Sequence, residues 1–100
     1  MARQSILIIE DDPLVAASIK TALEGLDFSV LAMAYDYVEA MDKILLEDID
    51  LAFVDINLHG RFEGLEIART IHRQGKYPFI FLTAYADRKI LDEAKQYQPA

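Results

Sequence analysis

The chain has 100 residues, 53% of them hydrophobic, which is enough for one small core and too little for two domains. The lack of cysteine excludes a disulfide framework and a thiolate metal site. Acidic residues outnumber basic ones by 17 to 10, and the net charge of −7 argues against direct nucleic-acid binding. We find neither an export signal nor an apolar run that could span a bilayer, so we expect a cytoplasmic protein without membrane attachment.

The first third of the chain predicts a strand, a helix and a strand. Ile6–Ile9 is a short apolar run rich in β-branched residues, which is typical of a strand buried on both faces. Asp12 then suits a helix cap, Pro13 suits the first helical position, and Gly25 suits the helix end. Phe28–Ala34 predicts the second strand.

The middle of the chain repeats this alternation. Asp36 predicts the cap of a second helix. The apolar residues expected on its packed face are Val38, Met41 and Leu45. Leu51–Val54 predicts a third buried strand, which runs directly into Asp55.

The last third adds a helix near Leu65–Gln74, ended by Gly75, a strand at Phe79–Leu82 and a helix at Ala86–Gln98. Buried strands that alternate with helices predict an α/β fold with a parallel sheet covered on both faces. Right-handed crossovers make it a doubly wound open sheet. We expect a single domain over residues 1–100.

Polar residues follow the strands at the ends where open parallel sheets bind their ligands. Glu10 and Asp11 follow the first strand, Asp55 and Asn57 follow the third, and Thr83 follows the fourth. If the first and third strands are neighbours, their carboxylates meet in one cleft, where a cation would be needed to relieve their repulsion. An oxygen-only ligand set predicts Mg²⁺.

Each of these residues also has a simpler structural explanation. The Glu10–Asp12 triplet can serve as a loop and helix cap, because negative charge is favoured at a helix N-terminus. Asp55 alone can be a solvated turn residue, and Thr83 can be a turn hydrogen-bonder. The case for a site rests on their joint occurrence at the same end of successive strands.

Three blocks of the sequence resemble the signature blocks of response-regulator receiver domains of the CheY-like superfamily. They are Ile6–Asp12 (ILIIEDD), Leu51–Leu58 (LAFVDINL) and Phe79–Asp87 (FIFLTAYAD). Their order and spacing also match, and the resemblance spans essentially the whole chain. It implies the flavodoxin-like receiver fold, of which this sequence carries four strand–helix units and lacks the fifth.

The resemblance implies a role for each site residue. Asp55 resembles the aspartate that accepts a phosphoryl group from a histidine kinase or a histidine phosphotransfer protein. Glu10 and Asp11 match the acidic pair that holds Mg²⁺ together with Asp55, and Asn57 lies where the family offers a backbone carbonyl to the metal. Thr83 resembles the hydroxyl residue that hydrogen-bonds the phosphoryl group. A receiver catalyses only its own phosphorylation and dephosphorylation and switches a downstream output.

Two departures from the family stand out. The family's fifth strand carries a lysine that pairs with the phosphoryl oxygens, and this chain reaches Ala100 about where that strand would begin. We therefore expect a truncated receiver whose fourth strand, Phe79–Leu82, is an unprotected edge open to homodimerisation. His59 stands near the usual position of a proline, and we interpret it as a loop residue beside the acidic site.

Two other functions compete with the phosphorylated switch. One is a Mg²⁺-dependent phosphatase with an aspartate nucleophile, but such enzymes usually carry an acidic residue two positions after the nucleophile, where this chain has Asn57. It would also need a cap domain, for which there are no residues. The other is a receiver-like interaction module that is never phosphorylated, against which the retained acidic residues argue.

Overall fold

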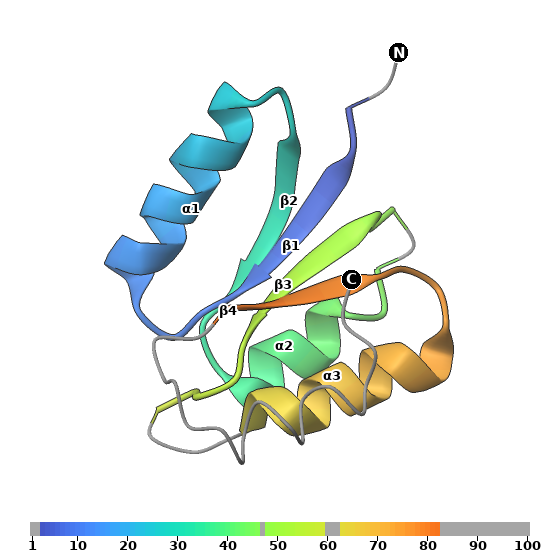
Figure 1. Ribbon diagram of the computed structural model, residues 1–100. Helices are drawn as coiled ribbons and strands as arrows, with labels where there is room; N and C mark the ends of the chain where they lie inside the picture. Colours follow the sequence, from blue (N-terminus) through green and yellow to red (C-terminus); the bar gives the residue numbers. More distant parts are fainter. Residues whose placement is uncertain (1–2, 47, 60–62, 83–100) are drawn as a thin grey trace.

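The computed structural model describes residues 3–46, 48–59 and 63–82, in which four parallel strands alternate with three helices (Figure 1). The strands are β1 (Ser5–Ile9), β2 (Ser29–Ala34), β3 (Leu51–Asp55) and β4 (Phe79–Leu82). The helices are α1 (Pro13–Gly25), α2 (Tyr37–Lys43) and α3 (Glu63–Gln74). The helix predicted at Ala86–Gln98 lies outside the described residues.

The sheet has the strand order β2-β1-β3-β4 with all neighbours parallel. The chain moves from β1 outward to β2 and then crosses back to β3 on the other side of β1, so the order reverses between β1 and β3. Helix α1 covers one face of the sheet, and α2 and α3 cover the other (Figure 1). This arrangement confirms the doubly wound α/β fold, and it places the topological switch point at the carboxyl ends of β1 and β3.

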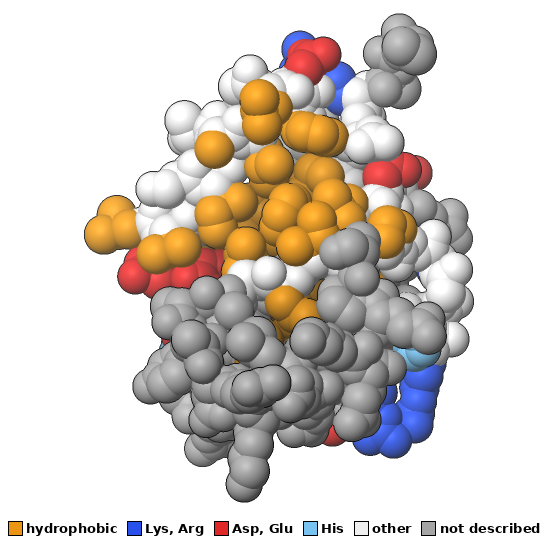
Figure 2. All heavy atoms as spheres, in the orientation of Figure 1, with side chains coloured by type: hydrophobic (Ala, Val, Ile, Leu, Met, Phe, Trp, Pro, Cys, Tyr) orange, Lys and Arg blue, Asp and Glu red, His pale blue; other side chains and the backbone are white. Residues whose placement is uncertain are grey.

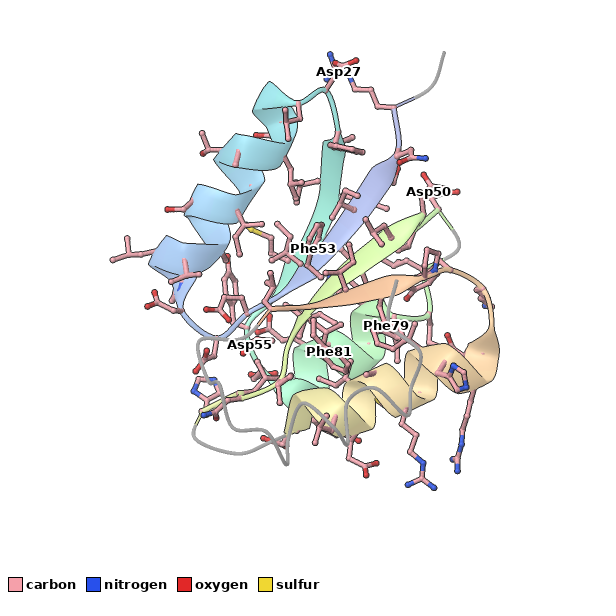
Figure 3. All side chains as sticks on the ribbon, in the orientation of Figure 1. Asp27, Asp50, Phe53, Asp55, Phe79 and Phe81 are labelled. Atoms are coloured by element: carbon pink, nitrogen blue, oxygen red, sulfur yellow. The ribbon has the colours of Figure 1, made fainter. Side chains whose placement is uncertain are left out.

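The core lies on both faces of the sheet because successive side chains of a strand point to opposite sides. In β1, Ile6 and Ile8 pack toward α1, whereas Leu7 and Ile9 pack toward α2 and α3. None of these four side chains is exposed, as expected for a central strand in a parallel sheet. Figure 2 shows hydrophobic side chains gathered on the sheet face beside α1, the face to which the half-buried Phe53 belongs (Figures 2 and 3).

Both predicted helix caps are present. The Asp12 carboxylate accepts a hydrogen bond from the Leu14 amide at 2.9 Å, and the Asp36 carboxylate accepts one from the Glu39 amide at 2.8 Å. These bonds satisfy amides that have no partner within the first helical turn. No helix in the described part of the chain is long and apolar enough to cross a membrane.

The expected packed face of α2 is wrong in part. Val38 is 75% exposed and Leu45 is 59% exposed, and Leu45 lies beyond the end of the helix. The residues that pack against the core are Tyr37, Ala40, Met41 and Ile44. Their spacing is the i, i+3, i+4, i+7 pattern of a helix face, turned by one residue from the face that the sequence indicated.

Two details of the sheet bear on the site. Asp55 is the last residue of β3 and pairs in register with Leu82, so it belongs to the sheet and is not a free turn residue. Strand β4 is the outer strand of the sheet that the described residues form. Homodimerisation through this strand stays a prediction.

Candidate functional site

Three carboxylates meet at the carboxyl end of the sheet. Glu10 and Asp11 follow β1, and Asp55, which is labelled in Figure 3, ends the neighbouring β3. One carboxylate oxygen from each residue lies within 4.8 Å of those of the other two. The convergence expected from the strand ends is therefore observed, because β1 and β3 are direct neighbours at the switch point.

Backbone hydrogen bonds position Glu10 and Asp55. The Glu10 amide donates a hydrogen bond to the Ala34 carbonyl at 3.0 Å, which extends the pairing of β1 with β2 to the first residue of the acidic cluster. The Asn57 amide donates to Asp55 Oδ1 at 3.1 Å, which restricts rotation of that carboxylate. Asn57 Oδ1 is itself buried and has no hydrogen-bond partner within the described ranges.

Burial and mutual repulsion change the protonation of this cluster. Glu10 is only 7% exposed and is the one buried charged side chain among residues 3–46, 48–59 and 63–82. Burial, a hydrogen bond with Asp55 and the charges of Asp55, Asp11 and Asp12 raise the pKa of Glu10 from 4.5 to about 8. Burial also raises the pKa of Asp55, although its hydrogen bonds with Glu10 and the Asn57 amide oppose the rise. The raised pKa of Glu10 favours its protonated form, which can donate a hydrogen bond to Asp55.

The cluster fits a divalent cation. In the part of the chain that the structure describes, no lysine or arginine forms a salt bridge with Glu10, Asp11 or Asp55. Burial, and after it the hydrogen bond with Asp55 and the charges of the neighbouring carboxylates, raises the pKa of Glu10, as expected for an acidic cluster with no cationic partner among the described residues. Closely spaced carboxylate oxygens are the ligands that Mg²⁺ prefers, with waters completing the coordination.

Gly64, at the start of α3, allows the helix to approach the acidic cluster closely. A Cβ at this position would overlap the Asp55 carbonyl oxygen and lie 2.7 Å from Ile56 Cα. The Gly64 amide donates to the Ile56 carbonyl at 3.1 Å, which fixes α3 to the end of β3. Only glycine fits here without displacing the backbone that carries Asp55. The sequence showed a glycine after the strand but not what it touches.

His59 does more than lie in the loop beside the acidic cluster, because it contacts the cluster directly. Its amide donates a hydrogen bond to Asp11 Oδ2 at 2.9 Å, and its ring Nε2 lies 3.0 Å from the Tyr35 carbonyl oxygen. Both contacts join parts of the chain that are far apart in sequence, so no local pattern could have indicated them. Thr83, the remaining predicted site residue, lies outside the described residues.

A model of the response regulator receiver domain family matches residues 6–98. The chain belongs to this family. It is thus a receiver domain of two-component signalling, and the acidic cluster lies at the carboxyl end of its sheet. The family assignment confirms the resemblance found in the three sequence blocks.

Known proteins support the assignment. The receiver is 36% identical to the phyllosphere-induced regulator PhyR of Methylorubrum extorquens over 95% of the chain, and it spans 39% of that protein's length. It is 32% identical to the signal receiver domain of a modulated diguanylate cyclase from Desulfovibrio desulfuricans, with a TM-score of 0.85 over 98% of this chain and 78% of that one. A CheY-like receiver from Methanospirillum hungatei matches the same shares with 26% identity and a TM-score of 0.86.

The stability of the metal-free receiver should fall as pH rises. The pKa of Glu10 is raised in the folded state, so the native protein binds a proton more tightly than the unfolded chain does. The resulting stabilisation is complete below about pH 4.5 and is lost as pH approaches about 8. We therefore expect the midpoint of thermal unfolding, measured in the presence of a chelator, to decrease across this pH range. Added Mg²⁺ should raise the midpoint most at the alkaline end of the range, where Glu10 is ionised.

Glu10→Gln is the matched control for this experiment. Glutamine has nearly the same shape and cannot ionise, so the variant should lose most of the pH dependence and most of the stabilisation by Mg²⁺. A midpoint that rises with pH in chelator, or a Glu10→Gln protein with an unchanged slope, would contradict the assignment of the raised pKa to Glu10.

Proposed function

We propose that Asp55 accepts a phosphoryl group from a phosphohistidine, carried by a histidine kinase or a histidine phosphotransfer protein. The proposed Mg²⁺ ligands are Glu10, Asp11, Asp55 and the backbone carbonyl of Asn57. The observation that supports this function is the convergence of three carboxylate oxygens within 4.8 Å at the end of the sheet. Membership in the receiver family supports the choice of Asp55 as the acceptor, because this residue ends β3.

The reaction is a displacement at phosphorus. A carboxylate oxygen of Asp55 forms a new bond to phosphorus while the phosphorus–nitrogen bond of the donor histidine breaks, and the departing imidazole keeps the electron pair and takes up a proton. Such transfers need positioning and charge neutralisation more than covalent assistance from the protein. Bound Mg²⁺ would supply that neutralisation for the phosphoryl oxygens and the acceptor.

The residues around Asp55 prepare it for this role. The Asn57 amide holds Asp55 Oδ1, which limits the orientations that the attacking carboxylate can take. The pKa values of Glu10 and Asp55 are both raised, which favours their protonated forms and opposes attack by the Asp55 carboxylate. A divalent cation held by Glu10, Asp11 and Asp55 would favour the ionised carboxylates and so make the acceptor available. This coupling supports a phosphorylation reaction that depends on the metal.

We further propose that phosphorylation switches an output and that the domain is not a metabolic enzyme. Thr83 follows β4 directly in the sequence, and it would hydrogen-bond a phosphoryl group on Asp55 and shift a two-state equilibrium in the chain that follows. The domain would act only on its own aspartyl phosphate, in the cytoplasm, where histidine kinases present their phosphorylated residue. No direct contact with nucleic acid is expected from its acidic surface.

Intact-mass spectrometry tests the proposal directly. The protein is incubated with acetyl phosphate in Mg²⁺ or in chelator, and in parallel with a phosphorylated histidine kinase core. We expect one phosphoryl group per chain in Mg²⁺ and none in chelator. Equal incorporation with and without the metal would overturn the proposed ligands. A failure to incorporate phosphate from either donor would instead favour an interaction module that is not phosphorylated.

A further inference from the structure

His59 connects the ends of three strands. The residue follows β3, its amide donates to Asp11 Oδ2 at 2.9 Å after β1, and its ring Nε2 lies 3.0 Å from the carbonyl oxygen of Tyr35 after β2. A second ring atom, Nδ1, lies 3.7 Å from the same Asp11 oxygen. The contacts span 48 and 24 residues of sequence, so they join separate parts of the fold.

The chemistry of the ring contact fixes which atom donates. A backbone carbonyl oxygen can only accept a hydrogen bond, so Nε2 must carry the hydrogen that it shares with Tyr35. The ring of His59 therefore binds the Tyr35 carbonyl after β2, and the backbone amide of His59 binds the Asp11 carboxylate. The contact of the His59 ring with Tyr35 thus fixes the position of the His59 backbone amide.

The backbone of His59 is held in an unfavourable conformation. Its φ is +53°, in the left-handed region that residues with a side chain seldom adopt. Residues persist there when surrounding contacts compensate, and such residues concentrate at functional sites. Here the compensating contacts are the two hydrogen bonds to Tyr35 and Asp11. If the ring contact were removed, the backbone would be expected to relax and the amide would leave the Asp11 carboxylate.

We propose that His59 is a positioning residue that orients the Asp11 carboxylate for the metal, acting through its own amide and held by its ring on Tyr35. This inference rests on the proposed function, since it assumes that Asp11 binds Mg²⁺. Asp11 follows the end of β1, and its side chain is 27% exposed. The orientation of its carboxylate therefore depends on a contact from a neighbouring residue. Hydrogen bonds to a metal ligand from a neighbouring residue commonly set both its orientation and the affinity of the site.

Calorimetric titration of Mg²⁺ into the intact chain tests the proposal with four proteins: wild type, His59→Ala, His59→Gln and His72→Ala. Alanine removes the ring contact, so His59→Ala should weaken Mg²⁺ binding about tenfold, as expected for loss of a residue that supports a ligand. Glutamine can place an amide donor near the position of Nε2, and His59→Gln should bind close to wild type. His72 is exposed on α3, away from the cluster, and His72→Ala should bind like wild type.

The outcomes separate this inference from the proposed function. Weakened binding by His59→Ala, with recovery in His59→Gln and similar thermal midpoints in chelator, would support the positioning role even if Asp55 failed to accept phosphate. Unchanged affinity in His59→Ala would overturn it while leaving phosphorylation of Asp55 intact. Equal weakening in the alanine and glutamine variants would also overturn it, because a donor at the ring position would then not matter. A wild-type protein that binds no Mg²⁺ would overturn both.

Discussion

Asp55→Asn should abolish phosphoryl incorporation from acetyl phosphate and from a phosphorylated kinase. The amide of asparagine is a poor nucleophile, and it cannot form the aspartyl phosphate that the carboxylate forms. The substitution keeps the shape of the side chain and removes a negative charge that lies beside Glu10 and Asp11. The variant should therefore fold at least as stably as wild type in chelator. Intact mass and the thermal midpoint measure the two expectations on the same sample.

Asp12→Asn is the matched control for this substitution. Asp12 is the next acidic residue after Glu10 and Asp11, but its carboxylate caps α1 through the Leu14 amide. Asparagine caps helices about as well as aspartate, so the control should keep both its stability and its phosphorylation. Full incorporation by Asp55→Asn, or loss of incorporation by Asp12→Asn alone, would show that the acceptor is a different residue.

Gly64→Ala should damage both stability and phosphorylation. The added Cβ would overlap the Asp55 carbonyl oxygen and approach Ile56 Cα to 2.7 Å, and these are backbone atoms that cannot move aside as a side chain can. Overpacking of this kind costs typically about 1–3 kcal/mol of unfolding free energy. Relief of the overlap requires the start of α3 or the end of β3 to shift, and a misplacement of about 1 Å can slow a positioned reaction about 100-fold. Denaturant unfolding and the initial rate of phosphorylation measure the two effects.

Gly25→Ala provides the contrast. No atom lies within 4 Å of a Cβ placed at Gly25, and the residue ends α1 without a positive φ. Alanine has the higher helix propensity, so this variant should be as stable as wild type or gain up to about 1 kcal/mol. If Gly64→Ala matched Gly25→Ala in both measurements, the close approach of α3 to Asp55 would not matter for the site.

The sequence indicated the fold because its strands are buried on both faces. A central strand such as Ile6–Ile9 reads as an unbroken apolar run, and the structure buries all four of its side chains. The helix caps were also visible, since Asp12 and Asp36 act on amides two or three residues away. The packed face of α2 could not be predicted from the sequence, because Val38 is as apolar as its neighbours and only tertiary contacts show that it points outward.

Only those residues of the candidate site that directly follow or end a strand could be predicted from the sequence. Glu10, Asp11 and Asp55 could be placed together from the alternation of strands and helices, and the structure brings them together. Their roles in metal binding and phosphoryl transfer stay predictions. The contributions of Gly64 and His59 depend on contacts across the fold and on a left-handed backbone conformation. No residue spacing in a single sequence encodes such contacts.

The central position of β1 affects how the site can respond to a signal. This strand is hydrogen-bonded to β2 on one side and β3 on the other, and its apolar side chains are fully buried. Amides in such a strand exchange with solvent only when the whole domain unfolds, whereas those of outer strands exchange through smaller openings. Glu10 and Asp11 are thus attached to the most protected segment of the sheet. Strand β3, which carries Asp55, is also hydrogen-bonded on both sides, so local openings of the outer strands of the described sheet, β2 and β4, should leave the spacing between the acceptor and the acidic pair unchanged.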